Sequence, residues 1–225
     1  MISWELIDSA QVPGNSGELC LYRRGGEFSI RATGVELMNS RIHGSEEALA
    51  ELACARIAQK IRAHILIGGL GMGYTLAAAL KRLGPESRII VAELVPQVVE
   101  WNRGPLAELN GHAFQDERVT VFDNDVAILL KEHHQAYDAI LLDVDNGPAG
   151  LIQKDNDWLY SKVGLDAACA ALRSGGVLAV WSANTDRAFA RRLRQAGFAV
   201  DEIGVRSRGK KKGRRHTIWL AMRGS

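Results

Sequence analysis

The residues most able to do chemistry in this sequence stand where short apolar runs end. The run at residues 65–67 leads into a turn with four glycines, Gly68, Gly69, Gly71 and Gly73. Only glycine lets the backbone approach a ligand closely, so a strand, such a turn and a following helix indicate a nucleoside-binding site. Glu93 ends the next apolar run, 22 residues after Gly71, at the spacing of a carboxylate that binds ribose hydroxyls.

Two further apolar runs end in acidic residues. Asp123, Asn124 and Asp125 follow the third run, and Asp143 ends the fourth. In a parallel sheet the ends of all four runs would meet at one edge, where open α/β folds bind their ligands. Each aspartate alone has a structural explanation, because Asp caps helices and shapes turns. Their joint occurrence in this order favours a nucleoside cofactor site.

We expect these residues to be positioned by strands that alternate with helices. The expected strands lie at residues 65–67, 88–92, 119–122, 137–142 and 177–181. Such alternation indicates an α/β protein with a mostly parallel, doubly wound sheet. The last two predicted strands, residues 200–205 and 217–222, have no helix between them and would form an antiparallel hairpin. This ending is typical of the class I methyltransferase variant of the Rossmann-like fold.

A small β unit is expected at residues 1–42, before a Rossmann-like domain at residues 43–225. Alternating runs at residues 19–23 and 27–31 flank two glycines, which is a hairpin signal, and a third strand is expected at residues 35–38. Ser45 is predicted to cap the first long helix. Glu46 and Glu47 would lie in its first turn, where negative charge suits the helix dipole.

Composition narrows the class of protein. The chain is 47% hydrophobic and 24% charged, as is usual for a globular protein, and no apolar run approaches the ~18–20 residues of a membrane span. No basic head precedes an apolar run at the N-terminus, so we expect no signal peptide. The three cysteines are far apart, which favours a reducing cytoplasm and no metal cluster. A nucleophile elbow and a phosphate loop are absent, which argues against hydrolases and kinases.

From about Ser45 to Ala183 the sequence resembles the spermidine synthase family of aminopropyltransferases, which has the class I methyltransferase fold. The resemblance is carried by residues 66–73, 91–94, 118–125, 137–143, 158–161 and 172–178. It implies a sulfonium donor, either S-adenosylmethionine or its decarboxylated form, with S-adenosylhomocysteine or methylthioadenosine as the product. It also implies a small-molecule acceptor, no metal and a homodimer.

The resemblance assigns a role to each candidate residue. Glu93, beside Leu94, would hold the donor ribose, and the segment from Asp123 to Asp125 would hold the adenine, with Asp125 at its amino group. The glycine turn would contact the ribose and the donor tail. Asp143 would orient and deprotonate the attacking amine. Because a sulfonium donor is already activated, the enzyme must mainly supply in-line positioning and a carboxylate that accepts a proton.

Two positions depart from the family pattern. Gly71 stands where the family has an aspartate that pairs with the amine of the decarboxylated donor. Asn146 stands where a second aspartate lies near the polyamine, although Asp145 is adjacent. Without an aspartate at position 71 nothing selects against a donor that keeps its carboxylate, and with Asn146 the site has fewer carboxylates for a cationic polyamine. We therefore favour methyl transfer slightly; the alternatives are aminopropyl transfer in polyamine biosynthesis and a non-catalytic nucleoside-binding module.

Two more regions bear on the acceptor. Trp158 and Tyr160 either line an acceptor pocket, together with Asp145 and Asn146, or belong to the core of a helix. The basic run at residues 206–215 holds seven Lys and Arg residues. It is either a solvated hairpin tip, which we favour, or a phosphate-contacting loop of a nucleic-acid methyltransferase.

Overall fold

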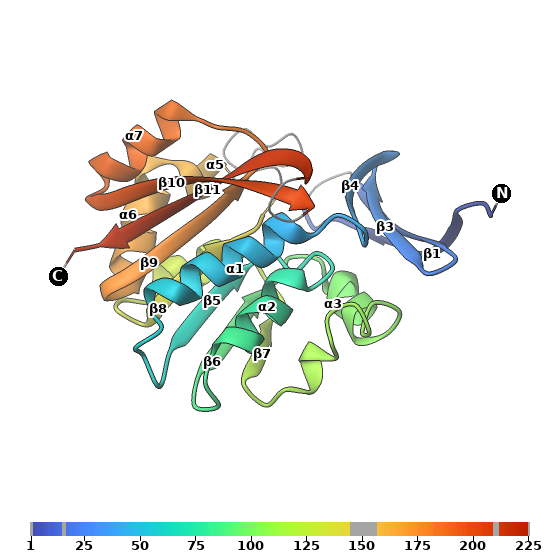
Figure 1. Cartoon of the computed structure of the whole chain (residues 1–225), viewed down its shortest axis with the longest axis horizontal. Coiled ribbons are helices and arrows are strands. Elements are labelled where there is room, and N and C mark those ends of the chain that lie inside the picture. The colour runs from blue at the N-terminus through green and yellow to red at the C-terminus, as the bar shows by residue number, and fades with distance from the viewer. Residues whose placement is uncertain (1, 15–16, 145–156, 209–211, 225) are drawn as a thin grey trace.

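A computed structural model of the chain describes residues 2–14, 17–144, 157–208 and 212–224 (Figure 1). A small antiparallel sheet contains β1 (Glu5–Gln11), β2 (Glu18–Arg24), β3 (Glu27–Ala32) and β4 (Val35–Asn39), in that order. The large sheet contains β5 (His64–Gly68), β6 (Arg88–Ala92), β7 (Val119–Phe122), β8 (Tyr137–Leu142), β9 (Leu172–Ser182), β10 (Phe198–Arg208) and β11 (Lys212–Arg223). Its order is β10-β11-β9-β8-β5-β6-β7.

Helices cover both faces of the large sheet. The helices are α1 (Gly44–Arg56), α2 (Tyr74–Arg82), α3 (Pro96–Arg103), α4 (Val126–Glu132), α5 (Asp157–Tyr160), α6 (Lys162–Ala171), α7 (Arg187–Gln195) and the 3-10 turn η1 (Ala113–Gln115). Apolar side chains of α1, α2 and α3 pack in one core, and those of α4, α6 and α7 pack in a second core. Strand β5 contributes side chains to both cores, because Ile65 and Ile67 pack in the first and Leu66 packs in the second.

The predicted fold class is confirmed. Strands β7, β6, β5, β8 and β9 pair in parallel, while β11 pairs antiparallel with both β9 and β10. All six residues of β8 are buried, as expected for a strand covered on both faces. The carboxyl ends of β5, β6, β7 and β8 therefore meet at one edge. None of the helices in the described residues is long and apolar enough to cross a bilayer.

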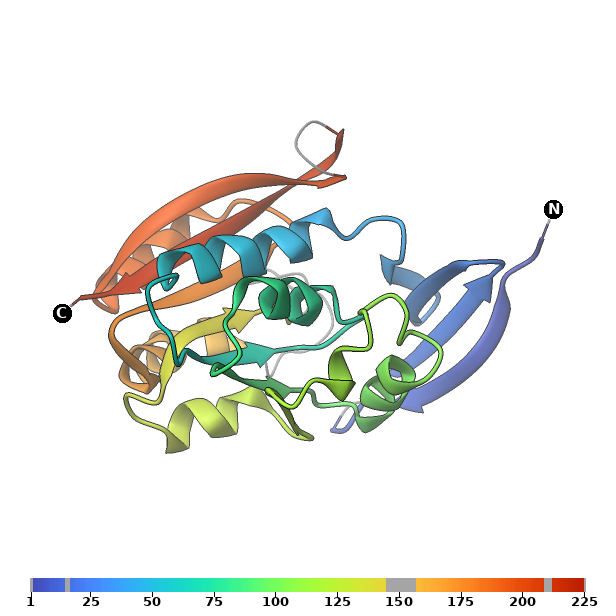
Figure 2. The same ribbon diagram turned by 60° about the horizontal axis from the view of Figure 1, so that its bottom comes forward.

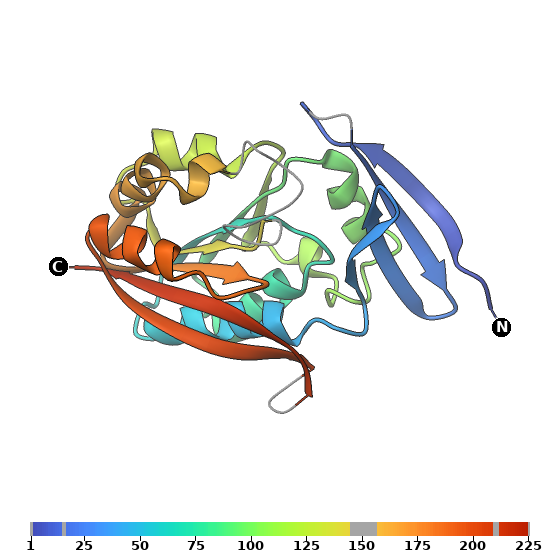
Figure 3. The same ribbon diagram turned by 90° about the horizontal axis from the view of Figure 1, so that it is seen from above.

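The small sheet lies at the end of the molecule opposite the C-terminus (Figures 1 and 3). Strand β1 was not expected from the sequence. Its Asp8 accepts hydrogen bonds from Gln97 Nε2 at 2.5 Å and Trp101 Nε1 at 2.8 Å, both on α3, so β1 is fastened to the larger layer. The division into units at residues 1–42 and 43–225 stays a prediction.

Two local expectations need correction. Helix α1 begins at Gly44 with His43 at its N-cap, so Ser45 is already inside the helix and its hydroxyl bonds Glu46 instead. The basic run is mostly not a loop, because β10 continues to Arg208 and β11 resumes at Lys212. Pairing along an established ladder overrides the weak strand preference of charged residues. Figure 2 shows this hairpin projecting past α1; its binding to nucleic acid stays an untested alternative.

Candidate active site

A cavity of about 880 Å³ opens at the carboxyl ends of the parallel strands. Its walls come from the glycine turn after β5, the ends of β6 and β8, and the start of α4. Strand β4, the first turn of α1 and the β10–β11 hairpin close the other sides. Large-sheet, small-sheet and hairpin residues thus enclose one space, in the place where open α/β sheets bind ligands.

The four predicted glycines divide into two pairs. Gly69 and Gly71 line the cavity with φ angles of 86° and 53°, a conformation that side chains rarely adopt. A Cβ on Gly69 would lie 2.5 Å from the carbonyl oxygen of Asp143, and one on Gly71 would lie 2.7 Å from Cε of Met38. A side chain at position 69 would thus strike main-chain atoms, one at position 71 would be strained by its φ angle, and the backbone of the turn itself lines the cavity.

Gly68 and Gly73 do not line the cavity, which corrects their expected role in binding the cofactor. A Cβ on Gly68 would lie 3.1 Å from side-chain atoms of Leu142 and Val126. A Cβ on Gly73 would lie 2.7 Å from Oδ1 of Asn102. These two glycines permit close packing beneath the turn rather than close approach of a ligand.

Glu93 is buried at the end of β6, and both of its carboxylate oxygens accept backbone hydrogen bonds. Oε2 accepts from the N–H of Leu70 in the glycine turn, and Oε1 accepts from the N–H of Val95, each at 2.9 Å. A carboxylate oxygen can accept more than one hydrogen bond, as ribose hydroxyls would require. Glu93 and Leu94 both line the cavity, so the structure brings this predicted pair to the expected place.

The segment after β7 contributes two of its three predicted residues. Asn124 and Asp125 line the cavity, and Oδ1 of Asp125 caps α4 by accepting the N–H of Ala127 at 2.8 Å. Asp123 is exposed and lies outside the cavity lining, so its expected contact with the cofactor is not supported. The chain turns at this point, which directs the side chain of Asp123 to solvent.

Asp143 follows β8 and lines the cavity beside the glycine turn. Its Oδ2 accepts a hydrogen bond from the Thr75 hydroxyl of α2 at 2.7 Å. Burial raises the pKa of Asp143 to about 6, and the Thr75 hydrogen bond opposes this rise only in part. The carboxyl group can therefore both hold and release a proton near neutral pH.

Glu46, in the first turn of α1, is a cavity residue whose role sequence reasoning missed. Only 8% of it is exposed, and Ser45 donates to its Oε2 at 2.6 Å. Burial and the nearby Asp143 carboxylate raise the pKa of Glu46 to about 7. A sequence signal existed, since Glu46 shares a helical stripe with the buried residues Leu49, Ala50 and Ala53.

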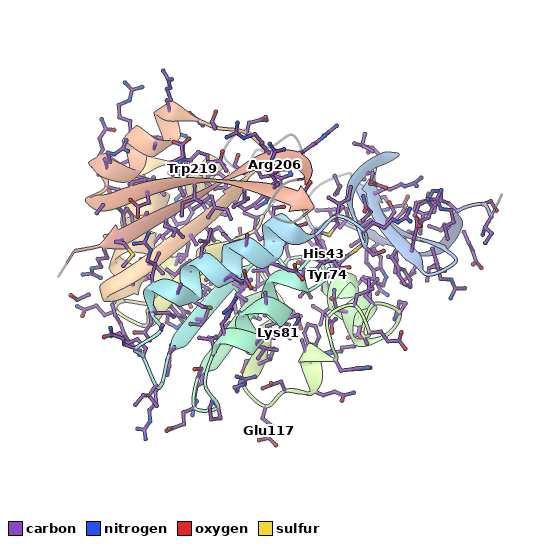
Figure 4. The ribbon with its side chains drawn as sticks, viewed as in Figure 1. His43, Tyr74, Lys81, Glu117, Arg206 and Trp219 are labelled. Atoms are coloured by element: carbon purple, nitrogen blue, oxygen red, sulfur yellow. The ribbon has the colours of Figure 1, made fainter. Side chains whose placement is uncertain are left out.

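Beside this site the aromatic rings of His43 and Tyr74 stack with centroids 4.1 Å apart (Figure 4). The Tyr74 hydroxyl donates to the Ser40 carbonyl at 3.2 Å, which joins α2 to the segment after β4. Burial raises the pKa of Tyr74 to about 12, so the phenol stays neutral. These contacts fix the first turn of α1, and with it Glu46, against the large sheet.

Trp158 and Tyr160 pack as part of the scaffold in the described part of the chain, and their place in an acceptor pocket stays a prediction. Tyr160 is buried, and its hydroxyl donates to the Val144 carbonyl at 3.1 Å. The Lys131 ammonium lies 4.4 Å from the centroid of the Trp158 ring. Neither residue lines the cavity, because α5 packs against the second core instead. The other two expected acceptor residues, Asp145 and Asn146, lie outside the described residues.

The cavity walls from the small sheet are mostly apolar, whereas the wall from the β10–β11 hairpin is polar. Strands β2 to β4 supply mostly apolar side chains, including Met38, while the hairpin supplies Ser207, Arg214 and His216. His216 stacks on Trp181 with centroids 4.9 Å apart. Within the described ranges, no group of three or more His, Cys, Asp or Glu residues could hold a metal ion.

The strand order and the cavity define a Rossmann-like protein of the class I methyltransferase type. A family model that describes the spermine/spermidine synthase domain matches residues 43–188. The match covers more than half of the 225-residue chain, so the chain belongs to the spermine/spermidine synthase family.

Similarity to known proteins agrees with this family. The polyamine aminopropyltransferase of Corynebacterium efficiens is 34% identical over 131 residues, covering 57% of this chain and 24% of that protein. Polyamine aminopropyltransferase 2 of Pseudomonas aeruginosa is 32% identical over 120 residues, covering 52% of this chain and 32% of that protein. The matched regions thus span about a quarter to a third of these curated relatives.

A solved structure has the same fold. The spermidine synthase from Thermotoga maritima superposes with a TM-score of 0.74 and 18% identity, covering 97% of this chain and 73% of that one. The expected preference for methyl transfer gains no support from the curated relatives, which are named aminopropyltransferases. They favour the alternative that the sequence left open.

Proposed function

We propose that the protein transfers an aminopropyl group from decarboxylated S-adenosylmethionine to an amine and releases methylthioadenosine. The observation that carries this proposal is that one cavity holds both parts of the required chemistry. Glu93 and Asp125 lie where a nucleoside would bind, and Asp143 lies between them and the first turn of α1. The names of the curated relatives add support for the aminopropyl group.

The proposed reaction is an in-line displacement. The amine nitrogen attacks the carbon attached to the sulfonium, the C–N bond forms, and the electrons of the C–S bond return to sulfur. The nitrogen must lose a proton, and the Asp143 carboxylate accepts it. Because the pKa of Asp143 is about 6, this group is mainly ionised at neutral pH and can act as a base.

Methyl transfer from S-adenosylmethionine is the second candidate, and the surroundings of Gly71 favour it. Met38 occupies the space above Gly71, with Sδ 2.8 Å from the place of a Cβ. Position 71 is a glycine with a φ of 53°, a conformation that side chains rarely adopt, so this point of the cavity offers no carboxylate to pair with a donor amine. The same point offers no repulsion to a donor carboxylate.

Turnover with both donors separates the two candidates. The full chain would be incubated with putrescine and either S-adenosylmethionine or its decarboxylated form, and the nucleoside product separated by chromatography. Methylthioadenosine from the decarboxylated donor alone is the expected result. S-adenosylhomocysteine as the main product would establish methyl transfer instead. Binding of a donor without turnover on any amine would favour the non-catalytic module.

The site residues are proposed to act within a homodimer, as the family resemblance implies, and in the cytoplasm, as the widely separated cysteines indicate. Sedimentation equilibrium of the full chain tests whether it forms the homodimer. A mass twice that of the 24.6 kDa chain is expected, and a monomer at micromolar concentration would contradict it.

A further inference from the structure

We propose that Glu46 and Asp143 form a carboxyl pair that shares one proton in the free site and binds the reacting ammonium of the acceptor. Ammonium binding displaces the shared proton, and Asp143 then removes the proton that the nitrogen must lose. The acceptor is thus a cationic primary amine rather than a neutral nucleophile. This inference rests on the proposed function and names the group that recognises its acceptor.

The geometry brings the two carboxyl groups together from distant parts of the sequence. Glu46 comes from the first turn of α1 and Asp143 from the end of β8, and both line the same cavity. Thr75 of α2 contacts both residues, since its Oγ1 is 2.7 Å from Asp143 Oδ2 and 3.3 Å from the main-chain carbonyl oxygen of Glu46. The hydroxyl has one proton, and the shorter distance assigns it to Asp143.

No described cation neutralises this pair. Neither Glu46 nor Asp143 takes part in an ion pair among the described residues. The titratable groups that face Glu46 are Asp143, His43, whose charge would lower the pKa of Glu46, and Tyr74, which stays neutral. Two uncompensated carboxylates in one buried place repel each other, so one proton stays with the pair near neutral pH.

This arrangement supplies the charge that a cationic amine needs. An ammonium placed between the two groups interacts with both carboxylates. Its positive charge offsets their mutual repulsion, so both groups can be ionised and the shared proton is lost. That proton leaves to solvent during binding. During transfer the second proton passes first from the ammonium itself to Asp143, the nitrogen lone pair that this frees forms the C–N bond, and the C–S electron pair returns to sulfur. One proton is therefore released on binding and one on transfer.

Calorimetry measures the first of these protons. Putrescine would be titrated into the full chain saturated with methylthioadenosine, in two buffers with different ionisation enthalpies. At pH 6.5 we expect release of about one proton per amine, falling toward zero at pH 8.5, where the free pair has already ionised. Proton release that stays constant between these pH values would overturn the shared-proton pair.

Variants in one helical turn identify the residue. Glu46→Gln should reduce proton release at pH 6.5 to less than half and weaken putrescine binding at least tenfold, while Glu46→Asp should restore part of both. Glu47→Gln is the matched control, because Glu47 contacts His43 at 3.2 Å and its side chain is 41% exposed. Equal proton release in Glu46→Gln and Glu47→Gln would contradict the role of Glu46.

Failure of this inference is distinguishable from failure of the proposed function. Methylthioadenosine binding, measured first with each variant, reports an intact nucleoside site and a folded chain. Turnover on amines together with unchanged proton release in Glu46→Gln would reject the pair and keep the transferase. Absence of methylthioadenosine binding, or of turnover with every amine and either donor, would reject the proposed function itself and the pair that depends on it.

Discussion

The two ends of the cavity both use carboxyl groups, but they hold them in different ways. At the end where we propose that the nucleoside binds (the nucleoside end), the oxygens of Glu93 and Asp125 accept hydrogen bonds from backbone N–H groups. At the end where we propose that the acceptor amine binds (the amine end), Asp143 and Glu46 receive their side-chain hydrogen bonds from the hydroxyls of Thr75 and Ser45. The pKa values of Asp143 and Glu46 are raised to about 6 and 7.

This difference fits what each end must do. Backbone N–H groups are fixed donors that cannot turn away, so they hold a carboxylate in one orientation for ribose and adenine groups, which gain and lose no proton during transfer. A hydroxyl can rotate and can also accept a hydrogen bond, so it tolerates a carboxyl group that gains and loses a proton. One end is suited to holding a nucleoside and the other to handling the proton of an amine.

The largest effect is expected from Asp143→Asn. If the amine end supplies the base, this change lowers the rate of transfer by about 10²–10⁴-fold, because general-base catalysis contributes that much. Nucleoside affinity should change little. Single-turnover measurements at saturating donor give the rate, and Asp123→Asn, which alters an exposed residue outside the cavity lining, is the control. A reduction smaller than tenfold would remove Asp143 from the role of base.

The nucleoside end is tested by Glu93→Gln. The amide nitrogen cannot accept a hydrogen bond, so either the N–H of Leu70 or that of Val95 loses its partner, as does one ribose hydroxyl. We expect the affinity for methylthioadenosine to fall by about 1–3 kcal/mol. Equilibrium binding measures this fall. Unchanged affinity in this variant and in Glu93→Ala would refute the ribose assignment.

Ionisation of Glu46 at the amine end should lower the free energy of unfolding as the pH rises. The pKa of Glu46 is raised to about 7 in the folded state, so the protein binds this proton more tightly folded than unfolded. The resulting stabilisation is present below the usual Glu pKa and is lost as pH rises through about 7.

Glu46→Gln replaces the carboxyl group with an amide that cannot ionise, so the variant does not lose stability in this way as the pH rises. It should increase the free energy of unfolding at pH 8 by about 1–3 kcal/mol relative to its effect at pH 4. Urea unfolding at the two pH values measures the difference, and Glu47→Gln serves again as the control. An equal change in the free energy of unfolding at both pH values would show that ionisation of Glu46 does not destabilise the folded protein.

The smallest effect is expected from a residue that belongs to neither end. Tyr160→Phe removes the hydrogen bond to the Val144 carbonyl and should cost about 1 kcal/mol of unfolding free energy. Binding of methylthioadenosine and putrescine should stay within twofold. A selective loss of putrescine affinity would return Tyr160 to the acceptor pocket.

The sequence revealed the nucleoside end more fully than the amine end, for a physical reason. Gly69, Gly71 and Glu93 stand at strand ends, and strand ends can be located from local apolar runs. Glu46 reaches the cavity only because α1 packs across the edge of the sheet, and Met38 only because β4 folds over the glycine turn. Such contacts join distant parts of the chain and leave no spacing in the sequence.

Other elements near the site were hard to delimit for similar reasons. Trp158 and Tyr160 stand near Asp143 in the sequence, but α5 has four residues, too few for an apolar pattern to show which face is buried, so the sequence left both a pocket role and a core role open. The hairpin arms were predicted too short because charged residues usually mark loops, whereas β10 and β11 stay paired as far as Arg208 and Lys212.

The close approach of Gly69 to Asp143 limits how this protein could change its chemistry. A side chain at position 69 would strike the main chain that carries Asp143, so variation in the turn would disturb the base along with the donor. Met38 belongs to a separate sheet and can vary without that penalty. Laboratory evolution toward a new donor should therefore accumulate substitutions in β4 and leave Gly69 untouched, which makes the small sheet the adaptable part of the protein.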